Sequence, residues 1–111
     1  MDNSSKVLFV YGTLAPGEEN AHIMDGMKGE WRKASVRGKR HNKGWGTAKG
    51  HPGFIPDEKG DIVNGLVFIS KDLPENWARL DKFEGKDYER IQIEAKLENG
   101  ETIEGQVYRA V

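Results

Sequence analysis

Val7-Leu8-Phe9-Val10-Tyr11 leads directly into Gly12-Thr13-Leu14-Ala15-Pro16-Gly17 near the start of the chain. A continuous run of β-branched and aromatic residues predicts a strand that is covered on both faces. Gly12 lets the main chain turn sharply or approach a bound group closely. The junction therefore predicts a buried strand whose end offers backbone amides to a ligand, with a plain turn at the end of a strand as the alternative.

The composition predicts one folded domain without bound metal or cofactor. The chain has 111 residues, a formal net charge of -1 and no cysteine. A chain of this length buries about 65% of its unfolded surface, and its near-neutral charge gives no argument for nucleic acid or an anionic membrane. The lack of cysteine excludes disulfides and thiolate chemistry, and the histidines show no metal-ligand spacing: His22, His41 and His51.

Charge is distributed unevenly along the sequence. Residues 28–50 hold eight basic side chains and one acidic one, which gives this basic segment a formal charge of +7 against -8 elsewhere. Its start, Trp31 to Val36, predicts a strand, and its glycines predict a long mobile loop after it. Gly65-Leu66-Val67-Phe68-Ile69 predicts a second buried strand, and the approach to it is punctuated by Pro52, Pro56 and Gly60.

Leu73 to Gly85 is the strongest helix signal in the chain. Pro74 suits the first turn of a helix and Gly85 suits its end. The apolar residues of this helix are spaced by four and three positions, as Leu73, Trp77 and Leu80. The next position on the same stripe is Glu84. A carboxylate is thus expected to continue the core-facing stripe at the end of the helix.

The C-terminal segment predicts a β-hairpin. Before the turn at Glu98-Asn99-Gly100, apolar residues alternate with polar ones. The apolar residues are Ile91, Ile93, Ala95 and Leu97. A two-residue loop would pair Ile91 with Tyr108 and leave two apolar residues on the polar face. A three-residue loop with a bulge at Gly100 pairs Ala95 with Ile103 and Ile91 with Val107, and we favour it because apolar residues then face each other.

Together these elements predict an α+β fold, a small mixed β-barrel with short helices. We expect residues 1–6 to be a flexible N-terminus and residues 7–111 to be a single domain. The N-terminal residues lack the apolar core of a signal peptide, and no apolar run reaches the length that spans a bilayer. A cytoplasmic protein without a membrane partner is expected.

The available residue types restrict the chemistry to acid/base catalysis. The sequence contains no Gly-x-Ser-x-Gly elbow and neither of the common phosphate-binding glycine loops. Glu84 is the leading carboxylate, because the negative end of the helix dipole and partial burial would both raise the pKa of its carboxyl group. The alternative is a solvated glutamate, or one paired with Arg79, Arg90 or Arg109.

Three sequence motifs resemble the γ-glutamylcyclotransferase superfamily and, within it, the AIG2-like and γ-glutamylamine cyclotransferase branch. The resemblance covers residues 7 to 111 in the expected order, and the ordered set is more specific than any one motif. The motifs are Val10-Tyr11-Gly12-Thr13-Leu14, Gly50-His51-Pro52-Gly53 ahead of Val63-Asn64-Gly65, and Leu80-Asp81-x-x-Glu84-Gly85-x-x-Tyr88-x-Arg90.

The resemblance implies a γ-glutamylcyclotransferase-like barrel that binds a small γ-glutamyl substrate. The turn after Tyr11 would hold the α-amino acid end of the γ-glutamyl group, and Glu84 would be the catalytic acid/base. The substrate α-amine would attack its own γ-carbonyl, which releases 5-oxoproline and a free amine from a γ-glutamyl amine or peptide. Further substrate-binding candidates are Tyr11, Gly12, Thr13, Leu14 and Tyr88, followed by Arg90 and Tyr108.

Two other functions stay open from the sequence. The same turn would serve a module that binds a γ-glutamyl or amino-acid-like ligand without turnover, since a protein can keep its fold after losing its activity. The basic segment, with Trp31 and Trp45 as stacking platforms, would suit an RNA or single-strand binder, although its aromatic residues are sparse. The sequence predicts a monomer, with a weak dimer left open, because no apolar surface stripe requires a partner.

Overall fold

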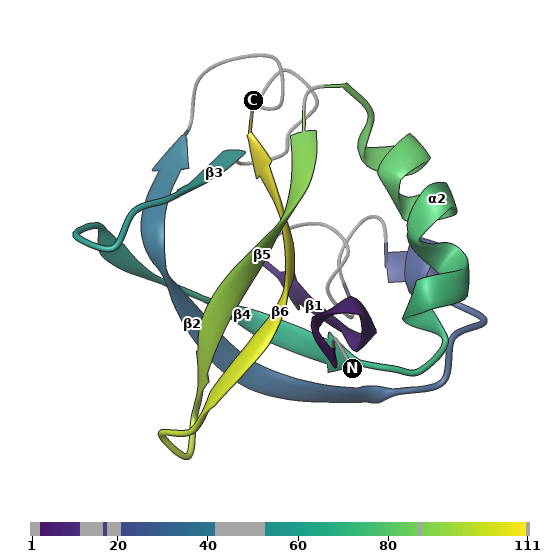
Figure 1. The fold of residues 1–111 in the computed structure, drawn as a ribbon, viewed down its shortest axis with the longest axis horizontal. Helices are drawn as coiled ribbons and strands as arrows, with labels where there is room; N and C mark the ends of the chain where they lie inside the picture. Colours follow the sequence, from purple (N-terminus) through teal and green to yellow (C-terminus); the bar gives the residue numbers. More distant parts are fainter. Residues whose placement is uncertain (1–2, 12–16, 18–20, 42–52, 87, 111) are drawn as a thin grey trace.

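The computed structural model describes residues 3–11, 17, 21–41, 53–86 and 88–110. Within these residues six strands and one α-helix form the fold (Figure 1), together with two short 3-10 helices, η1 and η2. In chain order the elements are η1 (Asn3–Lys6), β1 (Val7–Val10), η2 (Ala21–Met24), β2 (Glu30–His41), β3 (Gly53–Pro56), β4 (Asp61–Ile69), α2 (Leu73–Glu84), β5 (Tyr88–Leu97) and β6 (Thr102–Ala110).

The strands form a closed barrel. Their order is β3-β2-β4-β1-β6-β5, and β5 returns to β2 through the pairs Ala34 with Leu97 and Ser35 with Lys96. β3 lies outside this closed ring and pairs with the far end of β2. β1 and β6 run parallel, whereas the other neighbours are antiparallel, so the barrel is mixed. The predicted fold class is confirmed.

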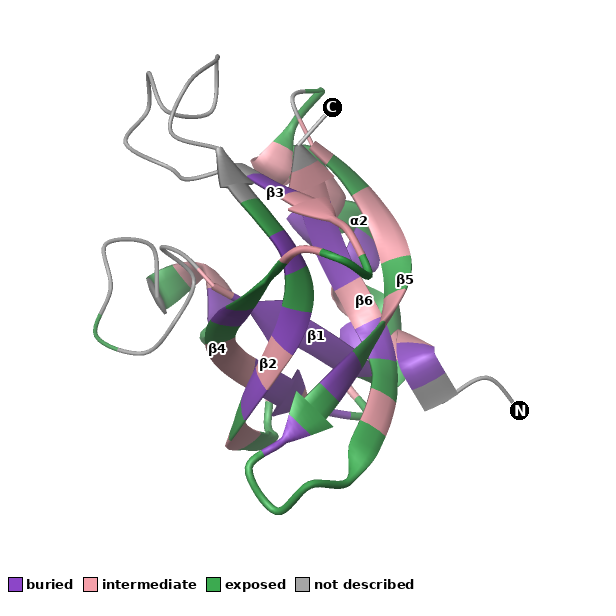
Figure 2. Cartoon of the chain, turned by 90° about the vertical axis from the view of Figure 1, so that its left-hand side faces the viewer, coloured by how far each residue is buried: buried purple, intermediate pink, exposed green. Residues whose placement is uncertain are grey.

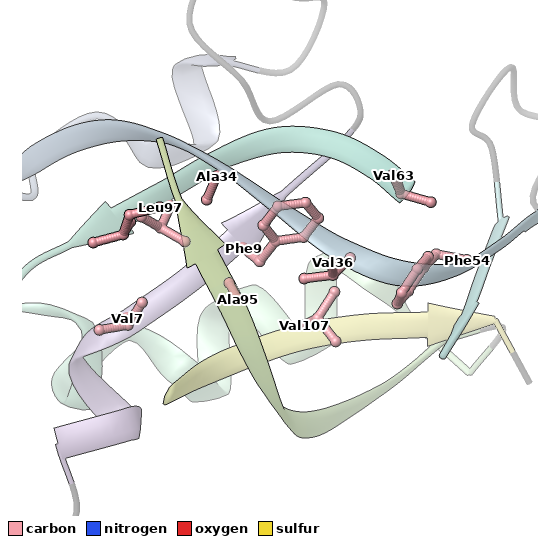
Figure 3. Close-up of a cluster of buried hydrophobic side chains, with 10 residues drawn as sticks. Val7, Phe9, Ala34, Val36, Phe54, Val63, Ala95, Leu97 and Val107 are labelled. Atoms are coloured by element: carbon pink, nitrogen blue, oxygen red, sulfur yellow. The ribbon is translucent and has the colours of Figure 1, made fainter. Parts of the chain in front are cut away.

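β1 is buried on both faces, as its sequence predicts, and is drawn in the buried colour in Figure 2, because it lies between two separate cores. Val7 and Phe9 point into the barrel, and Leu8 and Val10 point toward α2. The interior cluster is shown in Figure 3 and consists of Val7, Phe9, Ala34, Val36, Phe54, Val63, Val67, Ala95, Leu97 and Val107. The helix-side cluster consists of Leu8, Val10, Met24, Phe68, Leu73, Trp77, Leu80 and Tyr108.

The helix α2 begins and ends close to its predicted limits. Pro74 lies in its first turn, and Gly85 ends it with φ +78°, a conformation that glycine adopts at little cost. The predicted stripe of Leu73, Trp77 and Leu80 is buried, which holds the helix on the outer wall of the barrel. Glu84, the next residue of that stripe, is half-buried.

The hairpin of β5 and β6 has the register that the bulged loop predicts. Ala95 pairs with Ile103, and Ile91 pairs with Val107. Gly100 has φ +91°, which fits its place in the turn. Pairing apolar with apolar residues therefore gave the correct register.

The strand β3 is absent from the sequence prediction, which treated Pro52, Pro56 and Gly60 only as breaks. Four residues are too few to show a period, yet Phe54 within them is fully buried and belongs to the interior cluster. A Cβ at Gly38, its neighbour on β2, would lie 2.3 Å from the Phe54 ring, so this glycine makes room for the ring. β2 and β4 are also longer than predicted, and the loop predicted after β2 lies largely outside the described residues.

The N-terminal segment that we expected to be flexible contains η1. Ser4 is buried, and its hydroxyl accepts a hydrogen bond from Gln106 Nε2 at 2.9 Å. The carbonyl of Ser5 accepts one from the indole N–H of Trp77 at 2.8 Å. These contacts satisfy polar groups at the barrel wall and tie residues 3–6 to β6 and α2.

Candidate functional site

The candidate site lies where α2 ends and β5 begins. Glu84 is the last residue of the helix, and Tyr88 is the first residue of β5. The amide of Gly85 donates to the carbonyl of Asp81 at 3.0 Å, and the amide of Tyr88 donates to the carbonyl of Gly85 at 3.3 Å. The short connection therefore holds the helix end close to the start of β5.

Asp81 is the centre of the hydrogen-bond network at this site. Arg90 Nε donates to its Oδ1 at 3.0 Å and Nη2 to its Oδ2 at 3.3 Å, which is the strong two-bond geometry of an arginine and a carboxylate. The hydroxyl of Tyr108 donates to the same Oδ1 at 2.6 Å. Arg90 also lies over the Trp77 ring, 4.3 Å from its centroid, in a cation–π contact.

Tyr108 connects this network to the core. Its side chain belongs to the helix-side cluster and is 5% exposed. Burial, the hydrogen bond to Asp81 and the charges of Asp81 and Glu84 raise the pKa of Tyr108 far above its ordinary value of 10.0, and the Arg90 charge lowers it only in part. The phenol therefore stays protonated at neutral pH. The contribution of Glu84 shows that its carboxylate lies within electrostatic reach of this hydroxyl.

Tyr11 extends the network to the end of β1. Its hydroxyl donates to the carbonyl of Tyr108 at 3.0 Å. Its ring packs 5.3 Å from that of Phe54 and 6.3 Å from that of Phe9, centroid to centroid. The predicted substrate-binding turn begins directly after it, but three of the predicted positions lie outside the described residues: Gly12, Thr13 and Leu14.

The described site residues thus converge, although they come from distant parts of the sequence. Tyr108 and Arg90 both donate to Asp81, Tyr11 donates to the Tyr108 carbonyl, and Tyr88 packs against the helix-side cluster. The protons of the Tyr11 and Tyr108 hydroxyls are directed at protein acceptors, so these residues link elements in this structure. Their contact with substrate stays a prediction.

Sequence reasoning assigned no role to Asp81 or Trp77. The signal for Asp81 was its spacing, because residues three apart lie on the same side of a helix, and Asp81 precedes Glu84 by three. Trp77 was interpreted as core alone. It is buried, and its ring also carries the cation–π contact with Arg90. A sequence pattern cannot show that the guanidinium of Arg90, on another element, lies over this ring.

The basic segment contributes exposed cations on β2, Lys33, Arg37 and Lys39. Lys39 is paired with Asp57 at 3.7 Å. Trp31, one of the two aromatic residues of the nucleic-acid alternative, is half-buried with its ring 4.8 Å from that of Phe68. It therefore packs on the core, whereas Trp45 lies outside the described residues.

A cavity of about 220 Å³ opens between β2 and β5, at the opposite end of β5 from Tyr88. None of the predicted site residues lines it; it is lined by Ser35, Val36, Arg37, Ile62, Glu94, Ala95, Lys96 and Thr102. In the part of the chain that the structure describes, no three His, Asp or Glu side chains gather in a way that could hold a metal ion. Across the same residues, no helix is long and apolar enough to cross a membrane.

A protein-family model matches nearly the whole chain. The model of the family described as "Gamma-glutamyl cyclotransferase, AIG2-like" matches residues 8–110. The chain belongs to this family. The match includes every residue of the network around Asp81, and the family resemblance seen in the sequence motifs is confirmed. Curated protein sequences give no significant match.

Solved structures support the same fold for this γ-glutamyl cyclotransferase family member. A crystal structure of YkqA from Bacillus subtilis matches with TM-score 0.72 at 23% identity, over 95% of this chain and 35% of that one. A solution structure from Arabidopsis thaliana matches with TM-score 0.72 at 28% identity, over 95% and 61% of the two chains. A mouse AIG2-like protein matches with TM-score 0.70 at 21% identity, over 96% and 77%. The chain thus spans about a third of the length of the Bacillus protein.

Proposed function

We propose that this chain is a γ-glutamyl cyclotransferase that acts on a γ-glutamyl amine or peptide. Attack of the substrate α-nitrogen on the γ-carbonyl carbon forms the lactam C–N bond, and the bond from that carbon to the leaving amine breaks. One proton moves from the α-nitrogen to the leaving nitrogen. The products are 5-oxoproline and a free amine.

The observation that carries this proposal is the position of Glu84 in a chain of this family. Glu84 ends α2, is half-buried, and acts electrostatically on the buried Tyr108. Other described positions of the family motifs belong to the network at this end of α2: Tyr11 is bonded to Tyr108, Arg90 to Asp81, and Tyr88 to Gly85. A carboxylate held at such a place suits a group that accepts and returns a proton.

Besides this carboxylate, the reaction needs few catalytic groups from the protein. Closing a five-membered ring is intramolecular, and holding the two reacting ends together can be worth effective molarities of about 10⁵ to 10⁸ M. Glu84 would take the proton from the α-amine and deliver it to the leaving amine. Backbone amides of the turn after Tyr11 would hold the substrate carboxylate and stabilise the oxyanion.

The test is release of 5-oxoproline from a panel of γ-glutamyl amines and peptides. We expect turnover by the wild-type chain and a loss of about 10²- to 10⁴-fold in kcat for Glu84→Gln, the range that general acid/base groups contribute. Glu75→Gln is the matched control, because Glu75 is an exposed glutamate in the first turn of the same helix. It should keep wild-type activity.

Two outcomes would contradict the proposal. Full activity of Glu84→Gln would show that Glu84 is not the acid/base of the reaction. No 5-oxoproline from any substrate, together with a thermal shift on addition of glutamate or 5-oxoproline, would favour a γ-glutamyl-binding module without turnover.

A further inference from the structure

The last turn of α2 is held differently from the rest of the helix. Up to Leu80 the helix is anchored by buried apolar side chains and by hydrogen bonds to η1 and η2: Trp77 Nε1 donates to Ser5 O at 2.8 Å, and Arg79 Nη1 donates to Ile23 O at 2.7 Å. Beyond Leu80 no side chain of the helix is fully buried. A helix end also leaves its final carbonyls without partners inside the helix, so it opens readily. Glu84 lies at this end.

Asp81 holds this turn from two sides. Its backbone carbonyl accepts the amide of Gly85 at 3.0 Å, which closes the helix. Its carboxylate accepts two hydrogen bonds from Arg90 on β5 and one from Tyr108 on β6. The side chain of Asp81 is 43% exposed and that of Arg90 27%, so water reaches part of the ion pair, and its two-bond geometry is what distinguishes it from an ordinary surface pair.

The partners of Asp81 are themselves fixed. Arg90 lies against Trp77, which is buried, and Tyr108 receives the Tyr11 hydroxyl at its carbonyl. The carboxylate of Asp81 is therefore tied to β5 and β6 directly, and to the end of β1 through Tyr108. Asp81 and Glu84 are three residues apart and lie on the same side of the helix.

We propose that Asp81 is the positioning residue of the site, and that its bonds to Arg90 and Tyr108 fix the last turn of α2 so that the Glu84 carboxylate stays in place. This inference rests on the proposed function for its effect on catalysis. Its effect on the helix end is independent of that function. Asp81 itself does not need to contact substrate.

The first measurement is amide hydrogen exchange along α2. We expect Asp81→Ala to speed exchange at residues 82–85 by roughly tenfold or more, because hydrogen bonds to a charged group are lost, while the barrel strands keep wild-type protection. Asp81→Asn keeps an oxygen for Tyr108 but loses the charge that Arg90 contacts, so its effect should be smaller. Asp72→Asn is the matched control, since Asp72 accepts the Lys28 amide at the opposite end of α2.

The second measurement is steady-state kinetics with the best γ-glutamyl substrate. Misplacing a catalytic group by about 1 Å can cost roughly 10²-fold, so kcat of Asp81→Ala should fall by about that factor while KM changes little. Asp81→Asn should recover part of the rate. Tyr108→Phe, which removes only the 2.6 Å bond, should lie between Asp81→Asn and the wild-type chain.

Each outcome decides a separate claim. Unchanged exchange at the end of α2 in Asp81→Ala overturns the inference, and so does faster exchange with full kcat. Equally faster exchange throughout the barrel would mean that Asp81 supports the whole fold and has no special role at this turn. If the wild-type chain forms no 5-oxoproline, the proposed function fails, and the exchange data still show whether Asp81 holds the last turn.

Discussion

The interior cluster and the helix-side cluster share strands but differ in chemistry. Inside the barrel every member is aliphatic or phenylalanine, and Figure 3 shows these side chains converging from strands all round the wall. On the other face of β1 the cluster contains Trp77 and Tyr108, whose polar atoms reach Ser5 and Asp81. The barrel interior therefore supplies stability, and the layer under α2 also places charged groups at its rim.

The interior cluster gives the largest expected effect on stability. Phe9 is 2% exposed, and Phe9→Ala would leave a cavity in the barrel, which should lower the free energy of unfolding by about 3–5 kcal/mol. Urea denaturation measures the change. The proposed release of 5-oxoproline per folded molecule should fall less than in a comparable variant under α2. An unchanged unfolding midpoint would contradict the assigned role of the interior.

The helix-side counterpart is Leu80→Ala. Leu80 is fully buried, and its truncation should lower the free energy of unfolding by about 2–4 kcal/mol. Because Leu80 directly precedes Asp81, we also expect a fall in kcat per folded molecule. Stability and kcat are measured on the same preparation. A loss of stability with unchanged kcat would mean that the helix layer and the site are uncoupled.

Much of this comparison is predictable from the sequence. Burial of β1 on both faces, the stripe of α2 and the register of the hairpin each follow from a local apolar period, and all three are confirmed. Strand order does not follow, because the β2 to β5 pairing that closes the barrel joins Ala34 to Leu97, which are far apart in sequence. β3 was missed because its one core residue, Phe54, has no neighbours that repeat a period.

The residues of the candidate site could be named from the sequence, but the network that joins them could not. The sequence analysis named Tyr11, Glu84, Tyr88, Arg90 and Tyr108 as candidates. In the fold, Tyr11, Arg90 and Tyr108 join one hydrogen-bond network next to the end of α2. The spacing of Asp81 and Glu84 places them on one side of the helix, but it does not show whether Asp81 faces water or receives three hydrogen bonds. Only the placement of β5 and β6 against the helix shows the difference.

The smallest expected effect concerns the pH dependence of the helix-side cluster. The pKa of Tyr108 is raised in the folded state, so above pH 10.0 this phenol ionises in the unfolded chain but stays protonated in the folded one. The folded state then binds more protons, so the stability that this group contributes below pH 10.0 is lost as the pH rises. Tyr108→Phe should cost about 1–2 kcal/mol at neutral pH and show a shallower decline above pH 10.0 than the wild-type chain.

Urea midpoints of the wild-type chain and of Tyr108→Phe are measured at neutral and alkaline pH. They give the decline of stability with pH for each chain. Comparing the two declines separates ionisation of Tyr108 from loss of its hydrogen bond. The difference isolates Tyr108, since the other tyrosines are present in both chains. Equal slopes would show that Tyr108 titrates normally and that its hydroxyl is not held in the buried bond to Asp81. A steeper wild-type slope would show that the polar rim, unlike the barrel interior, makes stability depend on protonation.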